Sequence, residues 1–369
     1  MPCQIAVIGG GLAGLVACRN LAAAGLDFIL LEARDRLGGR ILSCDQEGFP
    51  CDDGFDLGPS WYWPEVQPEL AALVETLNLE TFPQNGDGDI LFERMSREAP
   101  QRCRPVEAPG GARRIAGGSA ALIRALADAL PAERLLTGVR AAAMRLSRET
   151  VDLTLHPAAG GETRLTALQV ILAAPPRLLA NSLAFQPPMD EAVLGRWRST
   201  PTWMAPQAKF FAIYDAPFWR DGGFSGTAQS MVGPMVEIHD ATTASGKAAL
   251  FGFVGPGPDQ RATWGEAALR RACLEQLARL FGAQALSPSA TLLKDWATDP
   301  LTATTQDRTP SRPGAPDQTA WISSLWAGRL LMAGSETSPR EPGYLAGAVQ
   351  AAAAAATAAV ARMDGQMKA

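Results

Sequence analysis

A chain of 369 residues, 47% hydrophobic and 19% charged, has the composition of an ordinary soluble protein and is long enough for two domains. Its formal net charge of −5 argues against a nucleic-acid partner, because no excess of basic residues is available to neutralise phosphates. The six cysteines show neither metal-ligand nor disulfide-framework spacing. We therefore expect no metal site, and free thiols in a reducing, cytoplasmic setting.

The first forty residues predict a βαβ unit. An apolar run at residues 4–8 predicts a buried strand that leads directly into a Gly-x-Gly-x-x-Gly turn, an amphipathic helix and a second strand. If a dinucleotide binds here, Gly9 permits the tight turn, Gly11 lets the backbone approach the pyrophosphate, and Gly14 lets the helix pack on the strand. The helix N-terminus would then face the phosphates, and Glu32, at the tip of the second strand, would bind ribose hydroxyls. This context predicts a Rossmann-like dinucleotide-binding unit.

The rest of the chain mixes helices and strands, with glycine and proline between them. Helices are predicted at 70–79, 119–130, 262–281 and from 343 onward. Strands are predicted at 90–92, 135–139, 143–146, 151–155, 163–166, 169–174, 208–214, 248–254 and 328–334. The alanine-rich run at 348–356 is too short and too weakly apolar to span a bilayer, so we expect a packed helix there.

Two observations favour FAD over NAD as the dinucleotide. The acid is followed by Arg34 and by the turn Gly38-Gly39-Arg40, which supply guanidinium groups that can reach the pyrophosphate. The sequence also has no second strand–GxGxxG–helix pattern, so it does not resemble a reductase that binds flavin and nicotinamide in two similar modules.

Residues 31–40, Leu-Glu-Ala-Arg-Asp-Arg-Leu-Gly-Gly-Arg, closely resemble the extended FAD motif of the flavin-containing amine oxidase superfamily. That group includes monoamine, polyamine and L-amino-acid oxidases. The resemblance recurs along the whole chain, at 55–61, 139, 208–210, 217–220, 294–300, 333–338 and 342–348. We therefore expect an α/β fold with two interleaved domains, one of them a Rossmann-like FAD-binding domain formed by residues 1–82, 108–198 and 297–369. A substrate domain with a mixed or antiparallel sheet would come from residues 83–107 and 199–296.

The residues expected at the cofactor lie in the glycine turns, at the strand ends and at the start of the last helix. They are Gly9, Gly11, Gly14, Glu32, Arg34, Gly39, Arg40, Gly58, Pro59, Ser60, Val139, Gly334, Glu336, Tyr344 and Leu345. The resemblance implies that Glu336 lies near the ribityl chain or the pyrophosphate. No cysteine follows Cys273, so FAD is expected to be noncovalent, at least to the C-terminal segment.

Lys209, Trp296 and Tyr344 are candidates for the reaction site. Lys209 interrupts an otherwise apolar strand, which is either a snorkelling edge lysine or a functional one. The resemblance implies that it binds a water beside flavin N5 and helps the reduced flavin react with oxygen. Tyr344 would form one wall of an aromatic cage that favours the developing positive charge of the amine. Trp296 either packs near the flavin, as the resemblance implies, or belongs to the core.

The chain departs from the family pattern at two places. Counting on from Trp296, Thr305 and Gln306 occupy the positions of the flavin-linking cysteine and the second cage tyrosine of monoamine oxidases. A cage with one aromatic wall and one amide, Gln306, weakens the case for a monoamine-oxidase-like site. After Gly58-Pro59 the chain has Ser60, where L-amino-acid oxidases carry a carboxylate-binding arginine. This lowers the case for an amino-acid substrate.

Other aromatic and basic groups are open to two interpretations. Trp61, Tyr62 and Trp63 either line an apolar amine pocket or pack at the domain interface. The two histidines, His156 and His239, are expected to be surface or structural residues.

The sequence therefore predicts an FAD-dependent amine oxidase or dehydrogenase. Hydride would pass from a C–N bond of a small amine to the flavin, and electrons would pass on to oxygen or another acceptor. Direct hydride transfer needs no strong general base, in keeping with only two histidines. The alternatives are a C–C desaturase of the carotenoid or porphyrinogen type and a catalytically silent flavin-binding protein. A desaturase usually has a membrane-facing patch, and the sequence has no amphipathic basic helix to supply one, so no membrane partner is expected.

Overall fold

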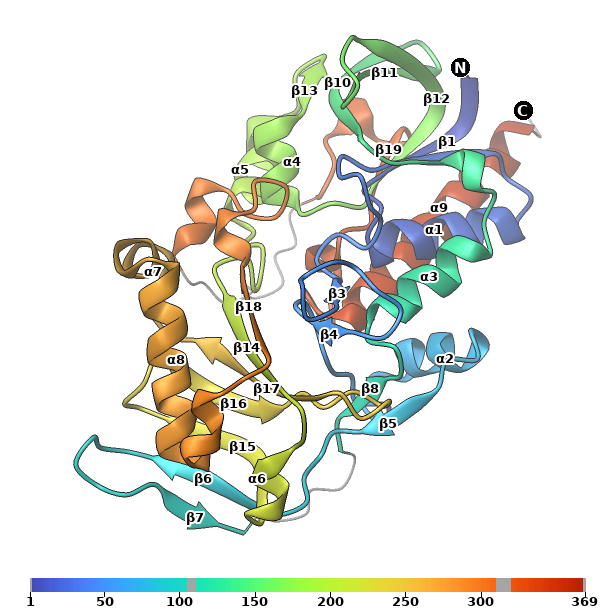
Figure 1. Ribbon diagram of the computed structural model, residues 1–369. Helices are drawn as coiled ribbons and strands as arrows, with labels where there is room; N and C mark the ends of the chain where they lie inside the picture. Colours follow the sequence, from blue (N-terminus) through green and yellow to red (C-terminus); the bar gives the residue numbers. More distant parts are fainter. Residues whose placement is uncertain (1, 105–110, 310–319, 368–369) are drawn as a thin grey trace.

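The computed structural model describes residues 2–104, 111–309 and 320–367, which fold around two large sheets (Figure 1). The predicted domain boundary between residues 107 and 108 lies outside the described residues. The strands of the first sheet fall in the segments assigned to cofactor binding, and those of the second fall in 83–107 and 199–296. The α/β fold class is therefore confirmed.

The first sheet has eight strands and carries the N-terminal βαβ unit. Its order is β13-β10-β11-β12-β1-β2-β9, with β19 also paired to β12. The strands are β1 (Pro2–Ile8), β2 (Phe28–Leu31), β9 (Leu135–Leu136), β10 (Val139–Ser147), β11 (Thr150–Pro157), β12 (Thr163–Leu172), β13 (Ala184–Gln186) and β19 (Leu330–Met332). β1 is parallel to β2 and β12, whereas β10, β11 and β12 form an antiparallel meander.

The prediction of separate strands at 163–166 and 169–174 is wrong. They are the two parts of one strand, β12, whose first part pairs with β11 and whose second part pairs with β19. Both parts also pair with β1, which holds them in one continuous strand.

Helices cover both faces of this sheet. On one face lie α1 (Leu12–Ala23), α2 (Pro68–Thr76), α3 (Ala120–Asp128) and α9 (Leu345–Met367), and on the other lie α4 (Pro176–Ser182) and α5 (Glu191–Ser199). Alternate residues of β1 enter the two cores: Ile5 and Val7 pack with α1 and α9, and Ala6 and Ile8 pack on the opposite side. Burial on both faces explains why this strand is apolar throughout.

α9 is long and apolar enough, by length and composition alone, to cross a membrane over Leu345–Gly365. However, 50% of its most apolar window is buried inside the protein, where the helix packs against α1, α2 and β19. Packing in the core accounts for the apolar character of this helix.

The second sheet has seven strands in the order β18-β14-β17-β16-β15-β6-β7. The strands are β6 (Asp89–Glu93), β7 (Gln101–Cys103), β14 (Ala208–Tyr214), β15 (Phe224–Ser230), β16 (Met235–Asp240), β17 (Ala248–Val254) and β18 (Ala290–Asp295). All neighbours are antiparallel except β15 and β6. β14 and β17 have the predicted bounds, whereas β15 and β16 were not predicted.

A long helix covers the outer face of the second sheet, and a short helix precedes it (Figure 1). The sequence predicted one helix over 262–281, but the chain forms α7 (Pro258–Trp264) and α8 (Glu266–Phe281). Gly265 lies between them with φ +75°, a conformation that an α-helix does not continue through. The short helix α6 (Phe218–Asp221) follows β14.

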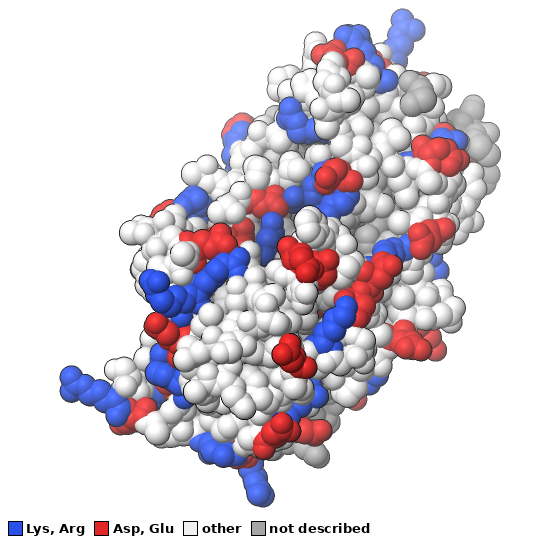
Figure 2. All heavy atoms as spheres, viewed as in Figure 1, with Lys and Arg blue, Asp and Glu red and all other residues white. Residues whose placement is uncertain are grey.

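Two small ribbons, β3–β4 (Ser43–Cys44 and Phe55–Asp56) and β5–β8 (Thr81–Pro83 and Arg113–Ile115), complete the fold. On the face shown in Figure 2, basic and acidic side chains are interspersed, without a continuous basic surface.

Gly14 limits how closely α1 can approach the end of β1. A Cβ added there would lie 1.9 Å from the carbonyl oxygen of Gly9. We predict that Gly14→Ala lowers the free energy of unfolding by about 1–3 kcal/mol or more, since the obstructing atom is backbone. Urea unfolding of the apoprotein measures this change.

Gly195→Ala is the matched control. A Cβ on Gly195, within α5, would meet no atom within 4 Å, so this substitution should stabilise the helix by about 0.5–1 kcal/mol. Equal effects of the two substitutions would contradict the close-packing role of Gly14.

Candidate functional site

A cavity of about 910 Å³ lies between the β1–α1 turn and the inner face of the second sheet. This volume is in the range of cofactor and small-molecule sites. All predicted cofactor residues line it except Gly14, which packs α1 against Gly9 as expected. Lys209, Trp296 and Tyr344 also line it, whereas Gln306 does not. The sequence blocks that resemble the amine oxidase family therefore come together around one cavity.

Two glycine turns form an open cradle in this cavity. Gly39 has φ +58°, and a Cβ added to it would lie 3.6 Å from the Cα of Gly11. A Cβ on Gly11 would come within 4 Å of a single backbone atom, the oxygen of Gly38. Arg36 fixes the second turn by donating hydrogen bonds to the carbonyl oxygens of Gly39, at 2.9 Å, and Leu37, at 3.0 Å. Side chains at either glycine would enter the cradle, and the N-terminus of α1 points at it, so the cradle fits a pyrophosphate.

Glu32 lies at the edge of the cradle and is 7% exposed. Its carboxylate accepts hydrogen bonds from the backbone N–H groups of Gly10, at 2.7 Å, and Arg34, at 2.8 Å. These bonds fix the carboxylate at the cavity wall, and each oxygen keeps a lone pair for a ribose hydroxyl. Val139 adjoins it, because its N–H donates to the carbonyl oxygen of Glu32 at 2.8 Å.

Arg40 and Glu336 form an ion pair on the cavity wall, with Nη1 and Oε1 2.8 Å apart. Arg40 also donates to the hydroxyl of Ser335 at 3.1 Å and to the carbonyl oxygen of Trp203 at 3.2 Å. The turn that carries Arg40 is thereby fixed to the segment that precedes α9.

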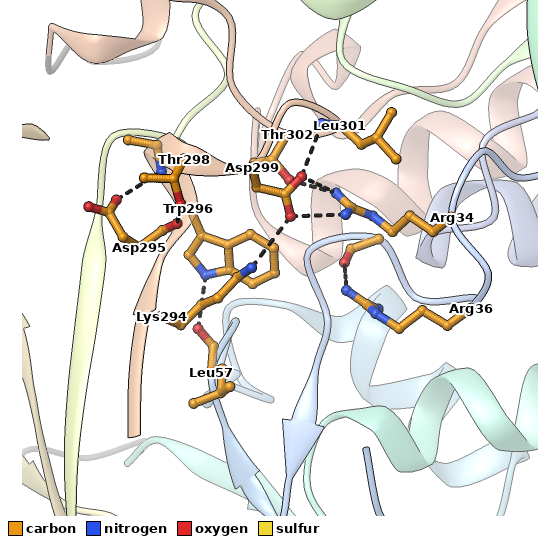
Figure 3. A network of polar contacts seen from close by, with 12 residues as sticks. Arg34, Arg36, Leu57, Lys294, Asp295, Trp296, Thr298, Asp299, Leu301 and Thr302 are labelled. Atoms are coloured by element: carbon orange, nitrogen blue, oxygen red, sulfur yellow. Dashed lines mark hydrogen bonds and ion pairs between the residues drawn. The ribbon is translucent and has the colours of Figure 1, made fainter. Parts of the chain in front are cut away.

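Arg34 differs from its predicted arrangement (Figure 3). The sequence predicted a guanidinium that reaches the pyrophosphate. In the structure the guanidinium instead binds both carboxylate oxygens of Asp299, at 2.9 and 3.0 Å, and the hydroxyl of Thr302 at 2.9 Å. Asp299 is the nearer partner because the loop after Trp296 folds back over this edge of the cavity.

Lys209 lies on the inner face of β14 and is 4% exposed. Its ammonium donates to the carbonyl oxygens of Gly58, at 2.5 Å, and Asp56, at 3.2 Å, and to the hydroxyl of Ser60 at 2.9 Å. The rings of Phe251 and Phe253 lie beside it, with centroids 4.5 and 5.2 Å from Nζ. It is a buried, fully hydrogen-bonded cation rather than a snorkelling edge lysine. Burial lowers the pKa of Lys209 from 10.5 to about 7.

Trp296 is buried at the cavity wall, and its indole N–H donates to the carbonyl oxygen of Leu57 at 2.9 Å.

Tyr344 is partly exposed at the start of α9, where burial and the charge of Glu341 raise its pKa. Its ring meets the ring of Trp203 edge-on, with centroids 4.2 Å apart. Trp203 lines the cavity and was missed by the sequence reasoning, although it stands six residues before Lys209 in a loop flanked by prolines.

The prediction that Gln306 forms the second wall of the cage is wrong. Gln306 is exposed and lines a second, polar pocket of about 660 Å³ next to α4, which adjoins the large cavity at Leu178, Ser182 and Pro300. The reason is its neighbour Asp307, whose buried carboxylate accepts from Arg177, at 2.5 Å, and from the backbone N–H groups of Thr202 and Thr304. Anchoring of Asp307 inward turns Gln306 outward, and the aromatic partner of Tyr344 is instead Trp203.

The two histidines have different surroundings. His156 is exposed on β11, but His239 lies on the cavity wall, where its Nε2 is 2.7 Å from the carboxylate of Glu237. This hydrogen bond outweighs the opposing effect of burial and lowers the pKa of Glu237. The sequence signal was the alternation Glu-x-His in a strand, which places both side chains on one face.

Both interpretations left open for Trp61 describe its position in the structure. It lines the cavity and also packs on the second sheet, with its ring centroid 4.7 Å from that of His239 and 5.4 Å from that of Phe251. Trp63 lines the cavity too, whereas Tyr62 is buried beside Arg113.

Over residues 2–104, 111–309 and 320–367, no three His, Cys, Asp or Glu side chains are grouped so as to hold a metal ion.

Comparison with known proteins supports this geometry. The sequence profile described as flavin containing amine oxidoreductase matches residues 12–109 and 98–360. An L-amino acid dehydrogenase from Synechocystis sp. is 26% identical over 457 residues, covering 97% of this chain and 95% of the relative. A putrescine oxidase from Kocuria rosea is 26% identical over 407 residues, covering 81% of this chain and 83% of the relative.

Solved structures show the same fold. Wild-type putrescine oxidase bound to putrescine matches with a TM-score of 0.79 and 20% identity, and covers 98% of this chain and 99% of its own. Cyclohexylamine oxidase from Brevibacterium oxydans matches with a TM-score of 0.81, 20% identity and the same coverage.

The lowered pKa of Lys209 predicts a pH dependence of stability. Between its folded pKa of about 7 and its ordinary value of 10.5, the unfolded chain holds a proton that the folded chain has lost. Stability should therefore rise with pH across this window, by at most about 1.4 kcal/mol per pH unit from this group.

Urea unfolding of the wild type and of Lys209→Met from pH 7 to pH 10 measures this effect. The readout is the slope with pH, because the substitution also removes three hydrogen bonds and lowers stability at every pH. The same slope in both proteins would contradict a strongly lowered pKa.

Proposed function

Because this chain belongs to the flavin-containing amine oxidoreductase family, we propose that its substrate is a small amine that carries a second positively charged group. The enzyme is an FAD-dependent oxidoreductase that oxidises the C–N bond of an amine. Nothing in the comparisons favours the desaturase alternative. The open question is therefore which amine the cavity selects.

FAD supplies the acceptor for the hydride that leaves the C–N bond. The protein supplies the surroundings: two helix N-termini, those of α1 and α9, point at the cavity and favour negative charge on the cofactor. No cysteine lines the cavity within the described parts of the chain, which supports noncovalent binding. Tyr344 and Trp203 offer aromatic surface that would orient an amine and favour its developing positive charge.

Glu237 carries the proposal. Three carboxylates line the cavity among the described residues, and two of them, Glu32 and Glu336, belong to the predicted cofactor cradle. Glu237 is the remaining one, and its lowered pKa keeps it ionised at neutral pH. A carboxylate at the wall of a largely apolar cavity attracts a cation or a hydrogen-bond donor.

The sheet register fixes where this carboxylate lies. Lys209 on β14 is opposite Phe253 on β17, and Phe253 is opposite Glu237 on β16. The three residues thus form one row across the inner face, with Lys209 and Glu237 about 10 Å apart at their Cα atoms. The amine being oxidised would lie at the Lys209 end, and the second cationic group would bind at the Glu237 end.

The cations of the cavity argue against an amino-acid substrate. Each lining Lys or Arg in the described chain already has a partner: Arg34 binds Asp299, Arg40 binds Glu336, Lys209 binds three oxygens, and Arg140 lies 3.2 Å from His156. Carboxylates compensate the charges of Arg34 and Arg40, whereas Arg140 faces a histidine and Lys209 binds neutral oxygens. Glu237 would repel a substrate carboxylate. Relatives named L-amino acid dehydrogenase and putrescine oxidase both match at 26% identity, so the preference for a diamine rests on the charges of the cavity.

We also propose that oxygen or another small acceptor takes the electrons, and that the protein acts in the cytoplasm without a membrane partner. All six cysteines are free, which is in keeping with a reducing compartment.

An amine panel tests the proposal. Under anaerobic mixing, α,ω-diamines should bleach the flavin at lower concentration than monoamines of the same chain length, and one diamine length should be best. We predict that Glu237→Gln lowers kcat/KM for the best diamine about tenfold, or about 1.4 kcal/mol, with little change for the matched monoamine.

Glu275→Gln, on the exposed side of α8, removes a carboxylate of the same kind far from the cavity lining and serves as the control. Equal losses for diamine and monoamine in Glu237→Gln would reject the second-cation role while leaving amine oxidation intact. Absence of bleaching with every amine would reject amine oxidation itself.

Lys209 is proposed to act on the oxidative half of the reaction. We predict that Lys209→Met slows reoxidation of the reduced flavin by oxygen about a hundredfold, and slows reduction by amine much less, since a positioned proton donor or water is lost. Stopped-flow absorbance of the two half-reactions measures both rates. An unchanged rate of reoxidation would remove Lys209 from this role.

A further inference from the structure

The pair formed by Arg34 and Asp299 joins two parts of the chain that are remote in sequence (Figure 3). Two parallel N–H to oxygen hydrogen bonds, of 2.9 and 3.0 Å, link the guanidinium to the carboxylate. The side chains are 12% and 9% exposed, so solvent screens the pair only partly. Bidentate geometry of this kind is directional as well as attractive.

On one side of the pair, Arg34 belongs to the predicted adenosine edge of the cofactor cradle. Its backbone N–H donates to Glu32, and its carbonyl oxygen accepts from Gly138 at 2.6 Å. The backbone of Arg34 is therefore fixed by the same groups that shape the cradle.

On the other side, Asp299 organises the loop that follows the 3₁₀ turn η3 (Trp296–Thr298). Its carbonyl oxygen accepts from the N–H of Thr302 at 3.0 Å, and its carboxylate accepts from the N–H of Leu301, also at 3.0 Å. Pro300, Leu301 and Thr302 line the cavity. Asp299 thus both folds this loop and attaches it to Arg34.

Lys294 and Trp296 attach the same segment at a second point. The indole N–H of Trp296 donates to Leu57, and the ammonium of Lys294 lies 3.4 Å from Asp299 and 4.4 Å from the centre of the Trp296 ring. The segment is therefore held on both sides of residues 300–302, at Leu57 through Trp296 and at Arg177 through Asp307, and the Arg34 contacts attach the loop between these points to the cradle.

We propose that the Arg34–Asp299 pair is a latch that holds the loop of residues 300–302 over the cofactor cavity and slows the release of FAD. Arg34 is then a positioning residue that acts through the loop. Asp299, which also faces Lys294, compensates part of the charge of Arg34 and turns its guanidinium toward the loop. The latch matters because no cysteine in the described lining anchors the cofactor covalently.

Asp299→Asn separates the latch from direct phosphate binding. The substitution keeps the size of the side chain, removes its charge and leaves Arg34 free to turn toward the phosphates. The latch predicts that FAD leaves this variant about tenfold faster, since a charge-assisted bidentate contact is lost. Direct binding of phosphate by Arg34 predicts unchanged or slower release.

The experiment follows the return of free-flavin fluorescence after the FAD-loaded enzyme is diluted into an excess of a flavin-trapping protein. Asp152→Asn is the matched control, because Asp152 forms a 3.0 Å ion pair with Arg145 on β10 and β11, and neither residue lines the cavity. Faster release from Asp299→Asn alone supports the latch. Release that is unchanged, slower or equal to that of the control overturns it.

A second variant, Thr302→Val, tests the latch if the Asp299→Asn protein does not fold. This near-isosteric change removes only the 2.9 Å bond from Arg34 to the Thr302 hydroxyl and leaves the ion pair. The latch predicts that release becomes about two- to fivefold faster, the effect of one lost hydrogen bond, and unchanged release would again overturn it. Neither measurement uses an amine, so the outcome does not depend on which substrate the enzyme oxidises.

Discussion

The ammonium group of Lys209 is the contact on which the geometry of the cavity depends. Buried without a carboxylate partner, it needs acceptors for all of its N–H bonds, and Asp56, Gly58 and Ser60 supply them. These acceptors lie at the end of β4 and just after it, outside the second sheet, while Lys209 lies within that sheet. Gly58 in turn packs on the glycine turn, since a Cβ on it would lie 1.9 Å from the carbonyl oxygen of Arg40. One buried cation therefore attaches the segment at the end of β4 to the second sheet at the wall of the cavity.

Neutral acceptors also give Lys209 its chemical character. A carboxylate in contact with the ammonium would favour the charged form, whereas carbonyl and hydroxyl oxygens compensate only part of the desolvation. The resulting pKa of about 7 means that the group can gain or lose its proton near neutral pH. A lysine in this condition repels a cationic substrate less than an ordinary lysine would. The same burial that constrains the fold thus suits the site to amines.

The sequence predicted the cofactor cradle well because its determinants are local. Gly9, Gly11, Gly14 and Glu32 act through a turn, a helix start and a strand end that lie within one βαβ unit. Lys209 was also visible from the sequence, since a charge inside an apolar strand demands an explanation. Both kinds of signal depend on neighbours in the chain.

The errors concern residues whose position is set by partners far away in the sequence. Gln306 was placed by counting from Trp296, but Asp307 is anchored by Arg177, and that contact decides which side chains of the turn face outward. Arg34 was placed by its motif, but its guanidinium binds Asp299, 265 positions along the chain. Motif spacing depends only on residues that are close in the sequence. It therefore cannot predict contacts between residues that are far apart along the chain, such as these.

The position of Glu237 at the cavity wall is a property of sheet register. Lys209, Phe253 and Glu237 form a row only because β14, β17 and β16 pair with no offset at that position. A one-residue slip of β16 would turn Glu237 and His239 toward α8 and remove the Glu237 carboxylate from the cavity wall. The pairing is irregular just before this point, between Met235 and Glu237, and regular after it. The irregularity absorbs one residue on β16, and this aligns the carboxylate with the buried cation two strands away.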